Sequence, residues 1–305
     1  MRAIISTPGG PGRVALTAGV PEPAPAPDEA LVAVEAFSLN PGELALLAAR
    51  PAGWRPGQDI AGTVVTPAAD GSGPAAGTRV AAVVEGAGWA ERAAVPVHAL
   101  AVLPAGVEMA AAATLGIAGR TALRTVALGG SLLGRRILVT AAGAVGRFQI
   151  QLAALAGAEV VAVSRRPDAA PELLDHGAAE VAATVGDAAG LFDLVLDDVG
   201  GRTLAAAVSK VAPGGTVVLI GVADPEPAQL TLTDFFGHEN AVIRSYFSYA
   251  QPGASGDDLA TLAGLLAGGR LRPPIGLHAS WDQTSDFLDA LANGKVDGKA
   301  VLDIR

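Results

Sequence analysis

The sequence predicts an α/β protein with two parts: a β-rich N-terminal part and a doubly wound parallel β-sheet covered by helices. Three observations support this fold class. Residues 1–107 contain short β-rich runs separated by Gly and Pro, which is typical of a small barrel or sandwich. From residue 137 onward, strand-like and helix-like segments alternate, which indicates parallel strands joined by helices. The length of 305 residues is enough for two domains of about 150 residues each.

The N-terminal part is predicted to contain β-rich runs that each end near a turn signal. These predicted strands are residues 30–37, 61–66, 78–84 and 90–96. The composition then changes, and residues 108–128 are rich in Ala and Leu and are predicted to be helical. Gly116 and Gly119 are weak points within this helix.

The alternating segment is predicted to form the parallel sheet. Its predicted strands are residues 137–141, 159–164, 180–184, 192–197, 216–220 and 241–246. The helices predicted between them are residues 145–156, 168–176 and 203–211, and amphipathic helices follow at 257–267 and 281–292. A final strand, residues 300–304, has no place in this alternation, so we expect it to return to the first domain.

Composition excludes several classes of protein. An apolar share of 50% and a charged share of 17% indicate a folded chain. Acidic residues number 30 and basic residues 21, and no run of Lys and Arg suits a nucleic-acid backbone. No apolar run is long enough to span a bilayer. We therefore expect a cytoplasmic protein without nucleic-acid or membrane partners.

The inventory of reactive side chains excludes further chemistries. Cysteine is absent, which excludes disulfides, cysteine zinc sites and cysteine nucleophiles. The histidines are dispersed along the chain, so no catalytic metal site is predicted; they are His98, His176, His238 and His278. Neither Tyr246 nor Tyr249 is followed by Lys four residues later, which excludes a short-chain dehydrogenase site.

The strongest local motif is glycine-rich and lies between a buried strand and a helix. It has the form Ala141-x-Gly143-x-x-Gly146, which matches a dinucleotide fingerprint except that Ala replaces the first Gly. Gly143 would let the backbone approach a pyrophosphate, and Gly146 would allow close packing of helix on strand. The free N–H groups of the helix N-terminus would hold the phosphates.

The end of the next strand predicts which nucleotide is bound. NAD-binding chains place an acidic residue about 20 residues after the fingerprint, where it binds the ribose 2′-hydroxyl. This sequence has Ser164, Arg165 and Arg166 there and no acid. Two guanidinium groups suit a 2′-phosphate, so we predict NADPH as cofactor. The alternative is that both arginines are a solvated surface pair.

With these motifs in order, the chain resembles the zinc-free, quinone oxidoreductase-like branch of the medium-chain dehydrogenase/reductases. The resemblance covers nearly the whole length. It depends on the order and spacing of segments 38–43, 56–64, 77–80, 118–123, 134–146, 196–201 and 298–302. Zinc-dependent relatives have Gly-His-Glu where this chain has Gln58, Asp59 and Ile60.

The resemblance implies a domain organisation and an activity. It implies a GroES-like β-barrel catalytic domain of residues 1–112 and 247–305, and a Rossmann NADP(H)-binding domain of residues 113–246. It also implies NADPH-dependent reduction of a quinone or an α,β-unsaturated carbonyl, which are small-molecule substrates. Many members are homodimers that pair the edge strands of their Rossmann domains.

The resemblance also implies site residues by position. Asn40, Glu43 and Thr121 are the expected catalytic residues, with a turn as the alternative for the Asn-Pro-Gly segment and helix packing as the alternative for Thr121. The expected cofactor-binding residues are Ala142, Gly143, Ala144, Val145, Gly146, Ser164, Arg165, Arg166, Val199, Gly221, Val222, Phe247, Ser248 and Lys299. For Lys299, which follows Gly298, a solvated side chain is the alternative.

Two other functions remain open at this stage. One is reduction of an enoyl thioester bound to CoA or a carrier protein, for which Arg50, Arg55 and Arg92 are the candidate basic patch. The other is a non-catalytic NADPH-binding, redox-responsive protein. It is suggested by the altered first glycine and by residues 44–49, where many relatives have a Tyr and this chain has only Leu and Ala.

Overall fold

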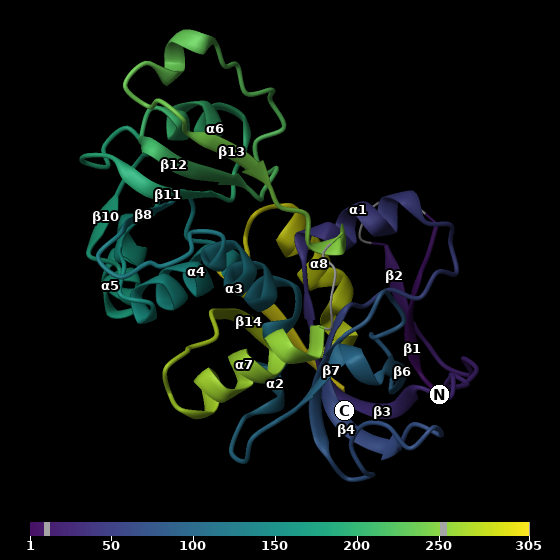
Figure 1. Cartoon of the computed structure of the whole chain (residues 1–305). Coiled ribbons are helices and arrows are strands. Elements are labelled where there is room, and N and C mark those ends of the chain that lie inside the picture. The colour runs from purple at the N-terminus through teal and green to yellow at the C-terminus, as the bar shows by residue number, and fades with distance from the viewer. Residues whose placement is uncertain (9–12, 251–254, 305) are drawn as a thin grey trace. The chain divides into compact units, whose positions relative to one another are not determined.

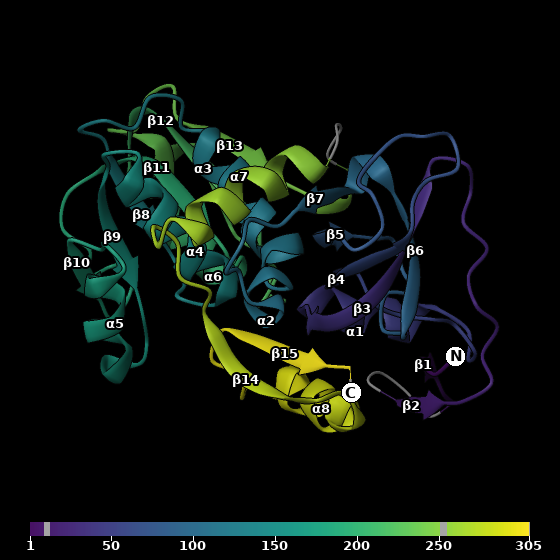
Figure 2. The ribbon, with the colours of Figure 1, turned by 90° about the horizontal axis from the view of Figure 1, so that it is seen from below.

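The computed structural model describes residues 1–8, 13–250 and 255–304. It divides into two compact units, which Figures 1 and 2 show with their elements labelled. Unit 1 comprises Met1–Arg120 and Pro252–Arg305, and unit 2 comprises Thr121–Gln251. Among the described residues, none of the helices combines the length and the apolar character needed to cross a membrane.

Unit 1 is built on a mixed β-sheet in the order β14-β15-β3-β4-β5-β7, with β6 paired to β3 and a separate β1-β2 pair. Its strands are β1 (Ala3–Ser6), β2 (Val14–Thr17), β3 (Glu29–Leu39), β4 (Asp59–Thr66), β5 (Arg79–Val83), β6 (Arg92–Pro96), β7 (Leu100–Val102), β14 (Ile275–Ser280) and β15 (Lys299–Asp303). Its helices are α1 (Pro41–Ala49), α2 (Met109–Ala112), α7 (Ser255–Ala267) and α8 (Thr284–Ala292), with short helices η1 (Val97–Ala99), η2 (Leu115–Gly119) and η6 (Trp281–Gln283).

The core of unit 1 contains side chains from most strands of this sheet. The rings of Phe37 and Trp89 stack there with centroids 5.5 Å apart, and Trp281 is also buried. The last strand completes the sheet, because β15 pairs antiparallel with β3 and places Leu302 opposite Phe37. Figure 2 shows β15 beside β14, and in the sheet β15 lies between β14 and β3. The predicted return of the final strand to the first domain is therefore confirmed.

Unit 2 is a six-stranded sheet in which all pairs are parallel. Its strands are β8 (Arg136–Val139), β9 (Glu159–Val163), β10 (Glu180–Ala182), β11 (Phe192–Asp197), β12 (Val211–Leu219) and β13 (Val242–Ser245). Its helices are α3 (Arg120–Ala127), α4 (Ala144–Leu155), α5 (Ala170–Asp175) and α6 (Gly201–Val208), with η3 (Pro167–Ala169), η4 (Leu232–Phe235) and η5 (Ser248–Ala250). α3 starts at Arg120, which is the last residue of the first segment of unit 1.

The strand order of unit 2 fixes where a ligand binds. The order β10-β9-β8-β11-β12-β13 is that of a dinucleotide-binding sheet, 3-2-1-4-5-6 when its strands are counted along the chain. The direction of winding reverses between β8 and β11. Ligands of such sheets bind at this point, at the carboxyl ends of the strands. The predicted parallel sheet, including its sixth strand, is confirmed.

The helix predicted over residues 108–128 is wrong as a single helix. The segment forms α2, η2 and α3, and the backbone leaves the helical region at Gly116, where ψ is −105°. A Cβ at Gly116 would lie 2.1 Å from Oδ1 of Asp59, which only glycine avoids. The kink therefore brings the backbone against a buried carboxylate.

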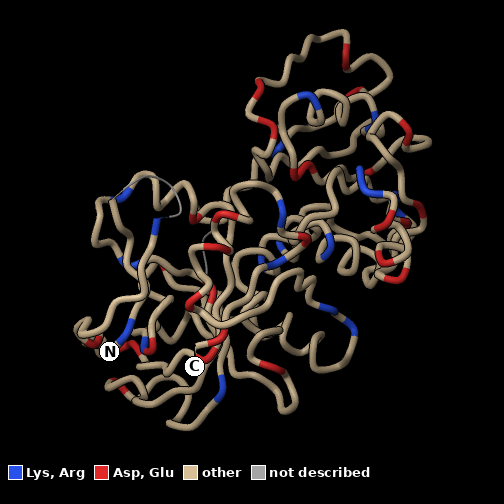
Figure 3. Tube along the Cα trace, turned by 180° about the vertical axis from the view of Figure 1, so that it is seen from behind, with Lys and Arg blue, Asp and Glu red and all other residues tan. Residues whose placement is uncertain are grey.

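Charged residues are spread over the trace. Figure 3 shows Lys and Arg interspersed with Asp and Glu along both units. Several pairs are surface ion pairs, such as Arg92 with Glu22 and Arg135 with Asp193. Exposed pairs of this kind each contribute little to stability.

Candidate functional site

Asn40 and Glu43 form the start of α1. Asn40 precedes the helix and Pro41 occupies its first position, where a missing N–H costs nothing. The Glu43 carboxylate accepts a hydrogen bond from Asn40 N at 2.8 Å and another from Gln58 N at 3.0 Å. Both side chains are buried. Glu43 thus caps the helix and fixes it to the segment that enters β4.

Lys299 lies inside unit 1. Its side chain is buried, and Nζ donates to Asn40 Oδ1 at 2.6 Å, to Leu39 O at 2.9 Å and to Asp59 Oδ2 at 3.2 Å. These three acceptors match the three hydrogens of the ammonium group. The solvated side chain considered for Lys299 is therefore wrong, and in this arrangement the ammonium has no hydrogen left for a cofactor phosphate.

Asp59 is the centre of this polar network. Its Oδ2 also accepts from Asn40 Nδ2 at 2.8 Å and from Ser38 Oγ at 3.1 Å, and its Oδ1 accepts from Ile117 N at 2.8 Å. We call Ser38, Asn40, Asp59 and Lys299 the Asp59 cluster. Sequence reasoning placed no role on Ser38 or Asp59. The signal available in the sequence was that Asp59 begins an otherwise apolar strand, because a carboxylate at such a place needs a buried partner.

Electrostatics at this cluster shift the protonation of Glu43. Burial raises the pKa of Glu43, the Asp59 charge raises it further, and the result is about 8 instead of 4.5. The hydrogen bonds from Asn40 N and Gln58 N and the charge of Lys299 act in the opposite direction and lower this pKa. Glu43 is therefore largely neutral at neutral pH.

The glycine-rich motif of unit 2 joins β8 to α4. A Cβ built at Gly143 meets no atom within 4 Å, so the backbone there is open to a ligand. A Cβ at Gly146 would lie 1.8 Å from Ala141 O, so only glycine fits this close packing. Ala144 begins α4, which presents free N–H groups toward the opening. These residues, with Ala142 and Val145 between them, fit a nucleotide pyrophosphate.

Ser164, Arg165 and Arg166 follow β9 directly. β9 is parallel to β8, so this segment and the glycine-rich motif lie at the same edge of the sheet. Arg166 N donates to Ser164 Oγ at 3.2 Å, which shapes the turn, and both arginine side chains are exposed. The segment fits a phosphate beyond the adenosine ribose.

The other residues predicted for the cofactor follow the next strands at that edge. Val199 comes after β11, Gly221 and Val222 come after β12, and Phe247 and Ser248 come after β13. A Cβ at Gly221 would lie 1.8 Å from Asp198 O, so the two strand ends are in close contact. The structure thus brings these residues together along one edge.

Thr121 lies on α3. It is buried, and its carbonyl oxygen accepts from Thr125 Oγ1 at 2.7 Å. Its role in the site stays a prediction.

Two aspartates at the end of β11 were not singled out from the sequence. Asp197 is buried and accepts from Thr140 Oγ1 and from Gly200 N, each at 2.9 Å. Burial, and then the neighbouring Asp197 charge, raise the pKa of Asp198 well above its ordinary value. Asp197 thus holds the loop that carries Val199.

Over residues 1–8, 13–250 and 255–304, the structure contains no group of three or more His, Asp or Glu side chains arranged to hold a metal ion.

Comparison with known proteins identifies both parts of the chain. Residues 26–119 match the alcohol dehydrogenase GroES-like domain, and residues 144–263 match the family described as zinc-binding dehydrogenase. A chloroplast envelope quinone oxidoreductase homolog of Arabidopsis thaliana is 32% identical over 65% of this chain and 68% of its own length.

Two further similarities extend over more of the chain. The spectinabilin polyketide synthase system protein NorB of Streptomyces orinoci is 33% identical over 91% of this chain, which spans only 13% of that protein. A mycobacterial structure in complex with NADPH has a TM-score of 0.84 at 22% identity, covering 99% of this chain and all of the other; it shows a shared fold.

The order of the two domain matches and the Arabidopsis relative agree with the sheets described above, a GroES-like unit followed by a Rossmann unit. They establish that the chain belongs to the medium-chain dehydrogenase/reductase superfamily, as a quinone oxidoreductase-like oxidoreductase.

Proposed function

We propose that this protein is an NADPH-dependent reductase that transfers hydride to a quinone or an α,β-unsaturated carbonyl. The observation that carries the cofactor assignment is the segment Ser164 to Arg166 at the end of β9. An acidic residue at this place would bind a ribose hydroxyl, whereas two guanidinium groups suit a phosphate. The mycobacterial protein of the same fold was solved with NADPH, which supports the assignment.

The residues of unit 2 would hold this cofactor along the carboxyl edge of the sheet. Backbone N–H groups from Ala142 to Val145 would bind the pyrophosphate. Val199, Gly221 and Val222 would line the nicotinamide ribose, and Phe247 and Ser248 would cover the ring. When bound, the reduced nicotinamide supplies the hydride. The task of the chain is to orient that group and to exclude water.

The catalytic residues proposed in unit 1 act mainly by position. Asn40 and Glu43 are buried, and their hydrogen bonds fix α1 against β4 and β15. Asn40 Nδ2 donates one of its two hydrogens to Asp59 in the structure. We propose that the second hydrogen of Asn40 Nδ2 contacts the nicotinamide or the substrate. Thr121 of unit 2 is the other residue that we propose for this contact.

The test is cofactor oxidation by the purified protein. We expect NADPH to be oxidised with at least one member of a panel of quinones and enones, and NADH to be used less well. Absence of turnover with every acceptor and both cofactors would refute the reductase. Tight NADPH binding without turnover would instead identify a redox-responsive binding protein.

A second function is favoured by the Streptomyces similarity. The match to a polyketide synthase protein covers 91% of this chain, so reduction of an enoyl thioester is the alternative. Activity on crotonyl thioesters without activity on free quinones would select it.

A further inference from the structure

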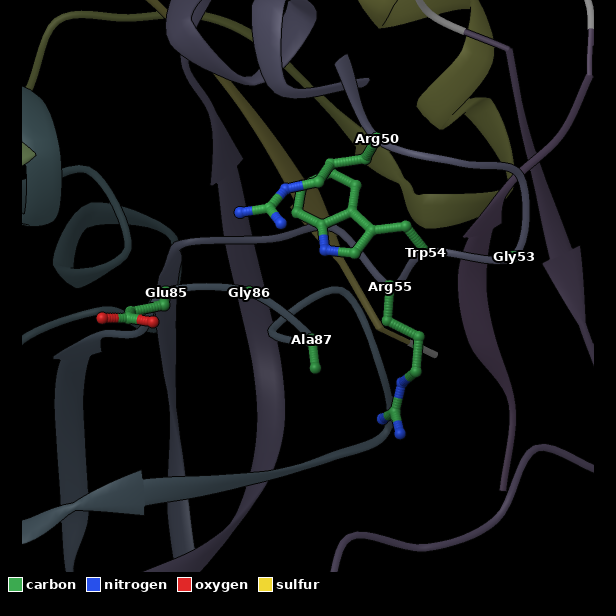
Figure 4. A pocket seen from close by; sticks show the side chains of 7 residues that line it. All are labelled: Arg50, Gly53, Trp54, Arg55, Glu85, Gly86 and Ala87. Carbon is green, nitrogen blue, oxygen red and sulfur yellow. The ribbon is translucent and has the colours of Figure 1, made fainter. Parts of the chain in front are cut away.

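Unit 1 contains an open pocket of about 410 Å³ where α1 ends. Arg50, Trp54 and Arg55 line one side of it, and the loop after β5 lines the other with Glu85, Gly86 and Ala87. Figure 4 shows Trp54 between the two arginines and Glu85 set apart from them. None of these residues belongs to the Asp59 cluster or to the residues proposed for the cofactor.

The pocket carries positive charge that the chain itself does not neutralise. Arg55 Nε and Nη2 are enclosed and have no hydrogen-bond partner among the described residues, whereas Nη1 is not enclosed in this way. A guanidinium group stays charged, and an enclosed donor without an acceptor is unfavourable. Burial accordingly lowers the pKa of Arg55. Glu85 is exposed and forms no ion pair with either arginine in the described part of the chain.

An aromatic surface lies beside this charge. Trp54 is partly exposed, whereas Trp89 and Trp281 are fully enclosed in the core. The Arg50 guanidinium lies 5.9 Å from the centre of the Trp54 ring, which orients its charge toward the indole. A ligand in this pocket would therefore meet a flat apolar face next to two cations.

The opposite wall is held in a conformation that side chains rarely adopt. Ala87 has a φ of 62°, and its N–H donates to Arg55 O at 2.8 Å. A Cβ at Gly86 would lie 3.1 Å from that same oxygen and 3.5 Å from the Trp54 ring. The loop is thus fitted closely to Trp54 and Arg55. Strained backbone of this kind is concentrated at ligand sites.

We propose that this pocket binds a small molecule that carries a carboxylate or phosphate group, with the positive charges of Arg50 and Arg55, on either side of Trp54, attracting the anion and Trp54 packing against the adjoining part of the ligand. Guanidinium groups match the oxygens of both anions. The proposal concerns binding by unit 1 and holds whether or not the proposed reductase activity is correct.

The test is a binding titration of the full chain, followed by tryptophan fluorescence and confirmed by calorimetry. The probes are inorganic phosphate, phosphopantetheine, crotonate and the uncharged pantetheine. We expect at least one charged probe to bind and pantetheine to bind at least about tenfold more weakly than phosphopantetheine or not at all. Trp54→Phe should remove the fluorescence change while calorimetry still detects the anion. Preference for phosphopantetheine identifies a thioester carrier as the source of the anion, and preference for crotonate identifies a small carboxylate.

Charge-removing variants decide which residues bind. Arg55→Gln and Arg50→Gln should each lower the affinity for the charged probe by about tenfold or more. Arg92→Gln is the matched control and should bind normally, because Arg92, although part of the basic patch considered from the sequence, does not line the pocket and pairs with Glu22. If circular dichroism shows that Arg55→Gln does not fold, the affinity of the Arg50→Gln variant decides the test, because Arg50 is exposed. Unchanged affinity in the Arg50 and Arg55 variants, or no binding of any charged probe, would overturn the proposal.

Discussion

The ammonium group of Lys299 joins three strands of unit 1 through one polar cluster. It belongs to β15, it donates to Leu39 O at the end of β3, and it pairs with Asp59 at the start of β4. Both partners of the ion pair are buried. Removing one member of such a pair leaves the other charged and enclosed, which is far more costly than the pair itself.

Replacing Lys299 tests this dependence. Lys299→Met should lower the free energy of unfolding by about 3–5 kcal/mol, because Asp59 loses its counter-ion. Chemical denaturation measures this change. The exposed Lys295→Met is the control and should change stability by less than about 0.5 kcal/mol. The double variant Lys299→Met with Asp59→Asn should cost less than the sum of the single changes; strict additivity would show that the two groups are not coupled.

Glu43 makes stability depend on pH. Its folded pKa of about 8 lies above the ordinary 4.5, so the folded state holds a proton that the unfolded state releases. The resulting contribution is fully present below pH 4.5 and is lost as pH rises through 8. We expect Glu43→Gln to flatten the fall in melting temperature between these pH values. A variant whose melting temperature follows the wild-type pH profile would contradict this origin.

Among the secondary-structure elements, long regular segments were predictable and contacts between distant segments were not. The six strands of unit 2 follow from local alternation. β14 was missed because its residues are half exposed and its pairing depends on β15, which lies beyond α8 in the chain. The break in the predicted helix at Gly116 depends on Asp59, which belongs to another strand. The Asp59 cluster likewise combines positions 38, 59 and 299, which no local pattern connects.

The turn after β9 contains Arg165 and Arg166, the two residues proposed to bind the 2′-phosphate. Changing Arg165 and Arg166 to Ala should raise the KM for NADPH at least about tenfold, because each lost charge-assisted contact costs about 1.5–3 kcal/mol. The KM for NADH should change little. Arg135→Ala is the control, since Arg135 lies before β8, at the opposite end of the strands. Steady-state kinetics with both cofactors measure the effect, and equal changes for both would exclude a 2′-phosphate contact.

The sheet of unit 2 ends in an exposed edge strand, β13, whose first two residues are apolar. Val242 and Ile243 of β13 are 52% and 38% exposed. Exposed edge strands of this kind pair with other chains. We predict a homodimer formed by two β13 strands, in line with the quaternary arrangement common in the family.

Light scattering on the purified protein checks the oligomeric state. The wild type should have twice the mass of one chain. Ile243→Lys should shift the measured mass toward that of one chain, because it places a charge on the edge strand. Leu133→Lys replaces an equally apolar side chain, 81% exposed and outside β13, and should leave the dimer intact. A monomeric wild type would contradict the prediction.

The placement of β15 in the sheet of unit 1 has a consequence for biosynthesis. Residues 121–251 are contiguous, so unit 2 has all its strands as soon as it has left the ribosome. Unit 1 must wait, because the amine that neutralises Asp59 is translated after every strand of the Rossmann sheet. During that interval the N-terminal segments carry an unneutralised carboxylate and an unpaired edge on β3, and they are the part of the nascent polypeptide that a chaperone would protect.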